Sequence, residues 1–129
     1  MKINNMNRAD KIAMFSKEIG DIADDGLRKL ATEIIARADE YFFTIPASSS
    51  GKFHPPFSLG EGGLVRHTKC VVYMVKCICE SFNIDEYKKD MLIVAALAHD
   101  IKKQGDCTEG CDFYWRILYV YAIMKSIKS

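Results

Sequence analysis

The sequence predicts an all-α fold, a single bundle of about five helices, from three observations. Apolar residues recur every three or four positions over several stretches, which is the spacing of one buried helical face. Asn83 and Asp85 stand between two such stretches, where they suit a helix end and a helix cap. The length of 129 residues, with 49% hydrophobic and 27% charged residues, is that of one globular domain with its own core.

Residues 1–43 are expected to form the first two helices. In the first, from about residue 8 to 22, the apolar positions that share one face are Ile12, Phe15, Ile19 and Ile22. Asp24, Asp25 and Gly26 then interrupt the pattern. The second helix is predicted from residue 27 to about 43, and its inward residues are Leu27, Leu30, Ile34 and Ala38.

Residues 44–63 are expected to form a long functional loop. Prolines and glycines through this stretch, with several serines, disfavour both helix and strand pairing; the prolines are Pro46, Pro55 and Pro56. Loops of about 20 residues without secondary structure are usually tied to function or disorder. The aromatic and histidine content favours function over a plain linker, and it comes from Phe53, His54 and Phe57.

Two further helices are predicted at residues 64–82 and 86–100. The first carries His67 on the same side as its inward apolar residues, which are Leu64, Val71, Val75, Ile78 and Phe82. The second is apolar all round from Met91 to Ala98, which is typical of a central buried helix.

The C-terminal tail, residues 106–129, follows a different pattern. Glycines and cysteines favour a turn near its start, and Phe113 to Met124 is then a dense apolar run in which only Arg116 is charged. Periodicity leaves open whether this run is a helix or a buried strand. Self-association through the apolar tail is therefore one expected interaction.

Bulk properties exclude several classes of protein. The net charge of +1 gives no global case for nucleic-acid binding. No run reaches the roughly 18 apolar residues of a membrane span, and the polar start lacks a secretory signal, so a cytoplasmic protein without membrane contact is expected. Five cysteines, an odd number, indicate reduced thiols instead of a disulfide framework, and the spacing of Cys107 and Cys111 alone does not make a zinc site.

The chemically informative residues are His99 and Asp100, which follow an apolar helix. Burying a histidine and a carboxylate there is costly unless they are paired or bind a metal. If the two predicted helices are antiparallel neighbours, the start of the first faces the end of the second, so His67 approaches them. Imidazole and carboxylate ligands suit Mn, Fe, Ni, Co or Zn. A metal with open positions lowers the pKa of water toward ~7 for attack on a phosphate ester.

Plainer interpretations stay open beside this one. A bare His-Asp pair is often only a polar helix end. His54 is equally compatible with a loop surface, and Arg66 with a solvated neighbour of the site. Lys103, after a helix C-terminus, is an ordinary complement to the helix dipole.

Four segments together resemble the HD superfamily of metal-dependent phosphohydrolases, in particular its branch of 3′-to-5′ exoribonucleases and relaxase-associated domains. They are Ile45-Pro46-Ala47-Ser48, Phe53-His54-Pro55-Pro56, Gly62-Gly63-Leu64-Val65-Arg66-His67-Thr68 and Ala95-Ala96-Leu97-Ala98-His99-Asp100-Ile101-Lys102-Lys103. The likeness covers roughly residues 41–105, so 44–105 is interpreted as the HD core of a single domain.

The resemblance implies a role for each matching residue. His67, His99 and Asp100 match the metal ligands, and Asp100 matches the residue that bridges two ions where two are bound. Lys103 matches a lysine near the substrate phosphate, which with Asp100 makes up the expected catalytic set. His54 matches a loop histidine, and we expect it to contact phosphate or metal. Arg66, beside His67, is a further candidate phosphate contact.

The chain departs from the family after Gly105. A further aspartate is expected on a later helix, whereas Asp106 and Asp112 come too early, and Lys102 replaces a usual glycine. The sequence thus predicts a phosphohydrolase acting on a nucleotide or nucleic-acid phosphoester with one or two divalent transition metals. The alternative is a truncated or catalytically impaired HD domain that serves as a ligand-binding or protein-interaction module.

Overall fold

The computed structural model describes residues 6–46, 56 and 60–101. Within them the chain forms five α-helices, one 3₁₀ helix and no strand, so the all-α prediction is confirmed for this part. The elements are α1 (Arg8–Met14), α2 (Ser16–Gly20), α3 (Asp25–Ala36), η1 (Glu40–Phe43), α4 (Gly63–Ser81) and α5 (Glu86–Ala98). The interior of the predicted loop and the whole tail from residue 102 lie outside the described residues, and predictions for them remain predictions.

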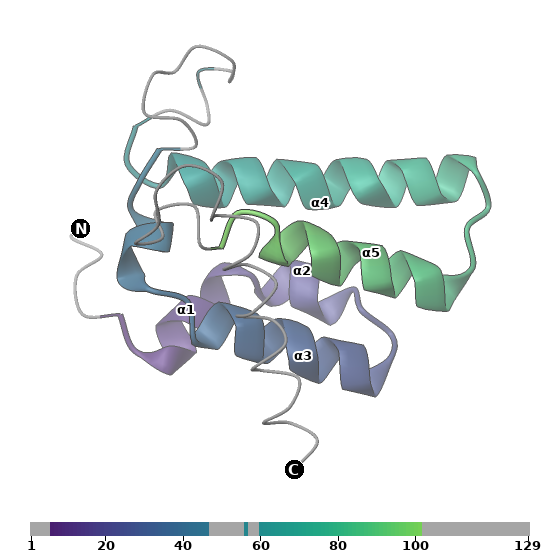
Figure 1. Ribbon diagram of the computed structural model, residues 1–129, viewed down its shortest axis with the longest axis horizontal. Helices are drawn as coiled ribbons and strands as arrows, with labels where there is room; N and C mark the ends of the chain where they lie inside the picture. The colour runs from purple at the N-terminus through teal and green to yellow at the C-terminus, as the bar shows by residue number, and fades with distance from the viewer. Residues whose placement is uncertain (1–5, 47–55, 57–59, 102–129) are drawn as a thin grey trace, which may run out of the picture.

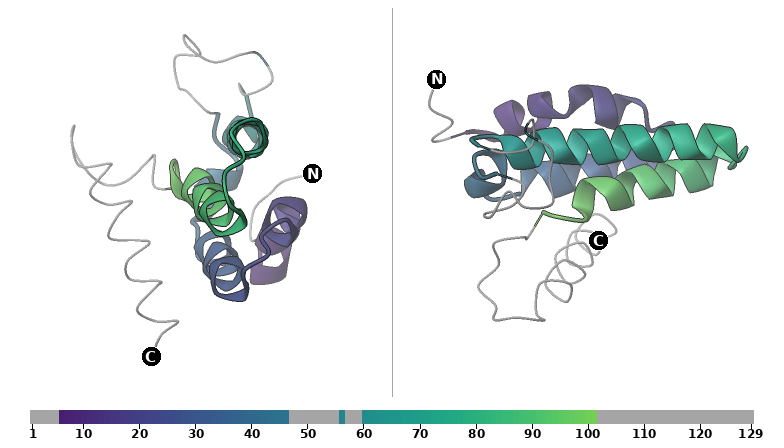
Figure 2. Two further views of the ribbon diagram at one scale, coloured as in Figure 1. Left: turned by 90° about the vertical axis from the view of Figure 1, so that its right-hand side faces the viewer. Right: turned by 90° about the horizontal axis from the view of Figure 1, so that it is seen from above.

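The helices are arranged around α5. It lies between α4 and α3, and α1 and α2 pack on α3 (Figures 1 and 2). α4 and α5 form a long antiparallel hairpin, which brings the start of α4 to the same end of the bundle as the end of α5 (Figure 1). This is the arrangement that the sequence-based argument for a metal site requires.

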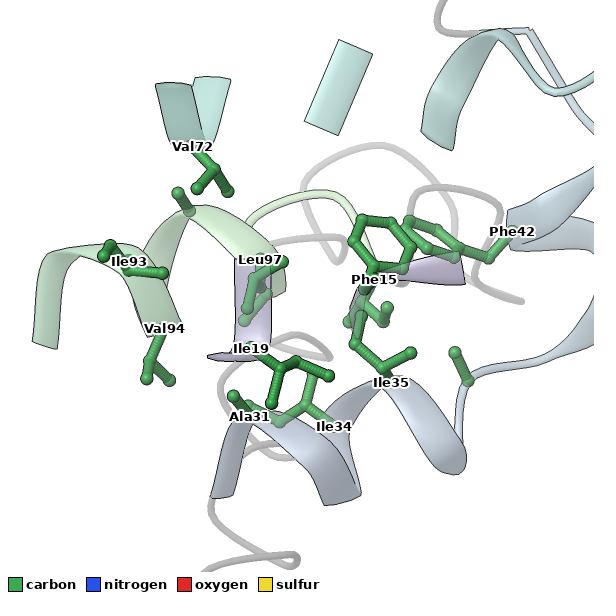
Figure 3. Close-up of a cluster of buried hydrophobic side chains, with 14 of the residues drawn as sticks. Phe15, Ile19, Ala31, Ile34, Ile35, Phe42, Val72, Ile93, Val94 and Leu97 are labelled. Carbon is green, nitrogen blue, oxygen red and sulfur yellow. The ribbon is translucent and has the colours of Figure 1, made fainter. Parts of the chain in front are cut away.

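One hydrophobic core joins all the layers. Figure 3 shows Val72 of α4 above Ile93 and Leu97 of α5, with Ile34 of α3 below them. Val72, Ile93, Ile34 and Leu97 are at most 1% exposed. Burial of this kind contributes about 25 cal/mol for each Å² of apolar surface removed from water, so the core dominates the stability of the bundle.

The predicted helix over residues 8–22 is in fact two helices, with a break at Phe15. The backbone there leaves the helical region (φ −121°, ψ 22°), and the Phe15 ring enters an aromatic cluster. Its centroid lies 6.0 Å from that of Phe42 and 6.4 Å from that of Phe43. Ile19 and Ile22 are buried as predicted.

The predicted helix over residues 27–43 is wrong in its bounds. α3 begins at Asp25, because the Asp24 carboxylate accepts a hydrogen bond from the Leu27 N–H at 2.9 Å, and it ends at Ala36. Residues 40–43 are 3₁₀ instead. The change of geometry buries two adjacent rings, Phe42 and Phe43, completely.

The turn of the hairpin confirms two sequence-based expectations. Asn83 adopts a left-handed conformation (φ 52°) directly after α4, and the Ile84 N–H donates to the Cys79 carbonyl at 2.9 Å. Asp85 caps α5, since its carboxylate accepts from the Lys88 N–H at 2.9 Å.

The inward face predicted for α4 is wrong at its far end. Ile78 and Phe82 are 54% and 73% exposed, while the positions that α4 buries are Leu64, Val65, Thr68, Val72 and Cys79. On α5, Met91 and Leu92 are 48% and 45% exposed, so this helix is not covered on all sides by the described residues. Both helices carry apolar residues on more than one side, and periodicity alone does not say which side meets the core.

Candidate metal centre

The start of α4 is held by the chain that leaves η1. Gly62 caps the helix in a left-handed conformation (φ 76°), and its N–H donates to the Thr44 carbonyl at 2.9 Å. The Leu64 N–H donates to the Ile45 carbonyl at 3.0 Å. His67 lies one turn further on and is therefore placed by these backbone bonds.

Two ion pairs between α4 and α2 fix how α4 is rotated about its axis. The Lys69 ammonium lies 3.0 Å from the Glu18 carboxylate and 4.9 Å from the centroid of the Phe15 ring. About two helical turns further on, Lys76 pairs with Asp21, the residue that follows α2. With its charged side held against α2, α4 directs His67 toward the end of α5.

The end of α5 supplies the other two residues. The helix stops at Ala98, and the Ile101 N–H donates to the Ala98 carbonyl at 3.2 Å, which turns the chain. Ile101 is buried (1% exposed) and draws the turn inward. Asp100 is consequently buried beside it, whereas His99 lies at the edge, with its side chain 34% exposed.

His67, His99 and Asp100 come together at this end of the hairpin. One ligand atom from each lies within 4.8 Å of the other two. The Asp100 carboxylate oxygen Oδ2 is 3.0 Å from His99 Nε2 and 3.7 Å from His67 Nε2, and the two imidazole centroids are 5.6 Å apart. The predicted juxtaposition of the three side chains is thus present.

These separations fit ligands around one ion. Metal–ligand bonds of about 2.1 Å place neighbouring ligand atoms about 3.0 Å apart in octahedral and about 3.4 Å apart in tetrahedral geometry. The two distances from Asp100 Oδ2, 3.0 and 3.7 Å, lie close to these values. The cluster could therefore hold a metal ion.

The hydrogen bond of His99 determines which of its ring nitrogens faces the carboxylate of Asp100. Its Nδ1 lies 2.6 Å from the Ala96 carbonyl, and because a carbonyl only accepts, Nδ1 carries a proton. In a neutral ring Nε2 then presents a lone pair toward the carboxylate oxygen of Asp100, 3.0 Å away. Two acceptors at this distance repel each other unless a proton or a metal ion lies between them.

The same bond orients the ring from behind. Metal-binding histidines commonly donate their other N–H to a carbonyl or carboxylate, which fixes the tautomer and the direction of the ring. The Ala96 carbonyl belongs to the last turn of α5, where carbonyl groups have no partner within the helix. Sequence reasoning missed this partner, because a backbone group leaves no mark in the residue types.

The remaining predicted site residues are not gathered around the cluster by the described structure. Arg66 is exposed, and its guanidinium folds over Gly62, since a Cβ added there would lie 3.2 Å from Arg66 Nη1. His54 and Lys103 lie outside the described residues, so their roles remain predictions. Free thiols are found at each described cysteine, as expected, namely Cys70, Cys77 and Cys79.

Sequence reasoning also passed over Asp90, a second buried acid on α5. It is 1% exposed, and its Oδ2 accepts hydrogen bonds from the N–H groups of Ala23 and Asp24 at 3.1 and 2.9 Å. Asp90 follows Lys88 and Lys89 in the sequence, so its residue type and its neighbours gave no signal that it is buried. Asp90 ties α5 to the start of α3 and lies apart from the metal cluster.

Comparisons with protein-family models, curated proteins and solved structures find no match to this chain. Within the described ranges, no helix is both long enough and apolar enough to cross a membrane. The site is thus characterised by its own chemistry: an all-α bundle carries a His/His/Asp cluster that could hold a metal ion.

Proposed function

We propose that the protein is a metal-dependent phosphohydrolase that acts on a phosphoester of a nucleotide or nucleic acid. The observation that carries the proposal is the meeting of His67, His99 and Asp100, with His99 Nε2 3.0 Å from Asp100 Oδ2 and Nδ1 of the same ring 2.6 Å from the Ala96 carbonyl. A metal ion held by these three side chains is compatible with this arrangement. The resemblance of the surrounding segments to the HD superfamily supports phosphoester hydrolysis as the chemistry.

In this proposal His67, His99 and Asp100 hold a divalent transition metal such as Mn, Fe, Co, Ni or Zn. When bound, such an ion supplies Lewis acidity, which polarises a phosphoryl oxygen and lowers the pKa of water toward ~7. Asp100, the most buried of the three, balances the charge, and the backbone of α5 orients His99. The exposed edge at His99 is the side from which a phosphoester reaches the site.

Arg66 is the described cation nearest in sequence to His67, and we assign it to the substrate phosphate together with His54 and Lys103. A guanidinium binds a phosphate through two parallel hydrogen bonds, which a lysine cannot do. Because the Arg66 guanidinium lies over Gly62, it would have to turn toward the cluster to orient the ester, while Lys103 would supply a point charge.

A second candidate function is a metal-binding module without turnover. It is favoured by the number of ligands, since the described residues bring only three together at this place. A site with fewer carboxylates neutralises less of the charge of two metal ions. The two candidates share metal binding and differ only in hydrolysis, so one experiment separates them.

The test uses the full chain, freed of metal by a chelator and titrated calorimetrically with Mn, Co, Ni and Zn. Turnover is measured on nucleotides, cyclic nucleotides and short RNA. We expect one of these metals to bind and to support hydrolysis, and His99→Ala and Asp100→Ala to lose both properties. The matched control is Glu80→Ala, an exposed acid at the far end of α4, which leaves both unchanged.

Two results would contradict the proposal in different ways. Tight metal binding without release of phosphate or nucleoside from any substrate in the panel would favour the non-catalytic module. Absence of binding by all four metals would remove both candidates and leave His99 and Asp100 as a polar helix end.

A further inference from the structure

The large hydrophobic side chains that the described residues leave exposed are confined to the α4–α5 hairpin. They are Tyr73, Met74, Ile78, Phe82, Tyr87, Met91 and Leu92, each 45–73% exposed. α1, α2 and α3 contribute none of them, because their apolar residues are covered by the core. The hairpin therefore has one side in the core and another that remains uncovered within the described structure.

On α4 the exposed residues Met74, Ile78 and Phe82 are four positions apart, so they form one line along the helix. Seven residues before Met74, the same line reaches His67. The neighbouring positions on this side are also uncharged, being Cys70, Val71, Cys77 and Ser81. Lys69 and Lys76, which pair with acids of α2, lie on another side of the helix.

On α5 a matching line runs through Leu92 and Ala95 to His99, with Met91 beside it. Leu92, Ala95 and Met91 are exposed. The two lines meet at the histidines, whose ring centroids are 5.6 Å apart, so they belong to one surface. We call this surface, made by Met74, Ile78, Phe82, Met91, Leu92 and Ala95, the outer face.

An apolar surface that extends along two helices is unusual for a protein that stays in solution as a monomer. Larger exposed patches of this kind usually mark a place where another segment or molecule packs. The chain itself offers a complementary segment, since Phe113 to Met124 is apolar apart from Arg116 and needs burial of its own.

The length of the chain allows this segment to reach the outer face. Residues 102–112 separate it from Ile101, and eleven residues span up to about 36–40 Å when extended. α5 is 13 residues long, which is about 20 Å at 1.5 Å per residue. Tethering also gives the segment an effective concentration of the order of millimolar, well above that of a second molecule in dilute solution.

We propose that residues 113–124 dock on the outer face of α4 and α5 within the same chain. Contact between the outer face and this apolar segment would remove apolar surface of both from water. The proposal holds whether or not the cluster turns over a phosphoester.

Trp115, the single tryptophan of the chain, lies in this segment and reports on it. We expect its emission in the full native chain to be shifted to shorter wavelength than in urea, at concentrations where the protein sediments as a monomer. In Ile78→Asp/Leu92→Asp the emission moves back toward the urea value and iodide quenches it several-fold more strongly. The control is Tyr73→Asp, an exposed aromatic of α4 outside the outer face, which leaves the emission unchanged.

Three results would overturn the proposal. The first is native emission that equals the emission in urea. The second is a blue shift that appears only with rising concentration and a doubled mass, which assigns the outer face to a second copy. The third is a blue shift that persists in the double variant while its helical circular dichroism is retained. Should that variant lose helicity, Met74→Gln/Met91→Gln removes apolar surface more mildly, and the same three outcomes apply.

Discussion

The first half of α5 and its C-terminal end each bury an aspartate, and the two carboxylates meet different partners. Asp90 accepts hydrogen bonds from two backbone N–H groups, those of Ala23 and Asp24. Asp100 faces two imidazole nitrogens, at 3.0 Å in His99 and 3.7 Å in His67. Their burial is similar, with 1% and 8% of the residue exposed, so burial does not distinguish their roles.

The partners do distinguish them. A backbone N–H is a donor at every pH, so the bonds of Asp90 are permanent and hold α3 against α5. An imidazole nitrogen either carries a proton and donates a hydrogen bond or carries a lone pair and accepts one. In the neutral form of His99 with a proton on Nδ1, the lone pair of Nε2 faces Asp100. A buried carboxylate that accepts hydrogen bonds from backbone N–H groups, such as Asp90, has a structural role. A buried carboxylate beside imidazole nitrogens, such as Asp100, is suited to share a metal ion with them.

The sharpest difference between the sites of Asp90 and Asp100 is expected in metal binding. A metal at 100 times its dissociation constant stabilises the native chain by about 2.7 kcal/mol. Removing one ligand by His99→Ala weakens binding about 100-fold or more, which reduces this stabilisation to less than about 0.5 kcal/mol. Urea denaturation with and without metal measures the gain in the free energy of unfolding for the native chain and for His99→Ala. If His99→Ala gained as much from the metal as the native chain does, the ion would bind elsewhere.

Asp90→Ala is expected to act on stability alone. It leaves two buried N–H groups without an acceptor, and loss of such charge-assisted bonds costs about 2–4 kcal/mol. The increment from metal stays at its native value, because Asp90 and Asp100 are ten residues apart along the chain and share no partner. Asp90→Asn, which keeps one acceptor oxygen, serves as the control and loses less. Weakened metal affinity in Asp90→Ala would end the distinction between the two acids.

A substitution at Thr68 tests whether a buried polar group next to the cluster takes part in metal binding. It follows His67 but is fully buried, and its hydroxyl has no hydrogen-bond partner in the described structure. Thr68→Val keeps the shape and removes the unsatisfied group, so stability should rise by about 1 kcal/mol with unchanged metal affinity. A fall in either quantity, measured by the same denaturation and calorimetry, would mean that the site uses the hydroxyl.

The smallest effect is expected at a carboxylate near the surface. Burial raises the pKa of Glu33, but hydrogen bonds and charges from Arg8 and Arg37 outweigh it and hold this pKa below its usual value near 4.5. The interactions of Glu33 with Arg8 and Arg37 therefore stabilise the folded chain fully above this usual pKa, and their contribution is lost as the pH falls through the lowered pKa. Arg8→Ala should cost less than about 1 kcal/mol at pH 7. In acid, below the lowered pKa of Glu33, the difference in the free energy of unfolding between the native chain and Arg8→Ala should be smaller than at pH 7. If Arg8→Ala lost the same free energy of unfolding at both pH values, the effect would come from packing.

Sequence alone was sufficient wherever the chemistry is local. Asn83 and Asp85 act within one turn of their own positions, and the histidines and Asp100 were recognisable because such residues are rarely buried without a partner. Tertiary packing decided the rest. Ile78 in α4 and Phe82 just after it are apolar yet exposed, because α4 has apolar residues on adjoining sides and only one of these sides meets the core.

The turn at Asn83 has a consequence for the tolerance of the chain to insertions and deletions. Asn83 stands sixteen residues after His67 and sixteen residues before His99, so the two arms of the hairpin are equal in length. A single residue added to either arm moves the histidine beyond it by about 1.5 Å along the axis and about 100° around it. Between these two positions, an insertion is compatible with the cluster only when both arms grow by the same number of whole turns, about seven residues in each arm for two turns.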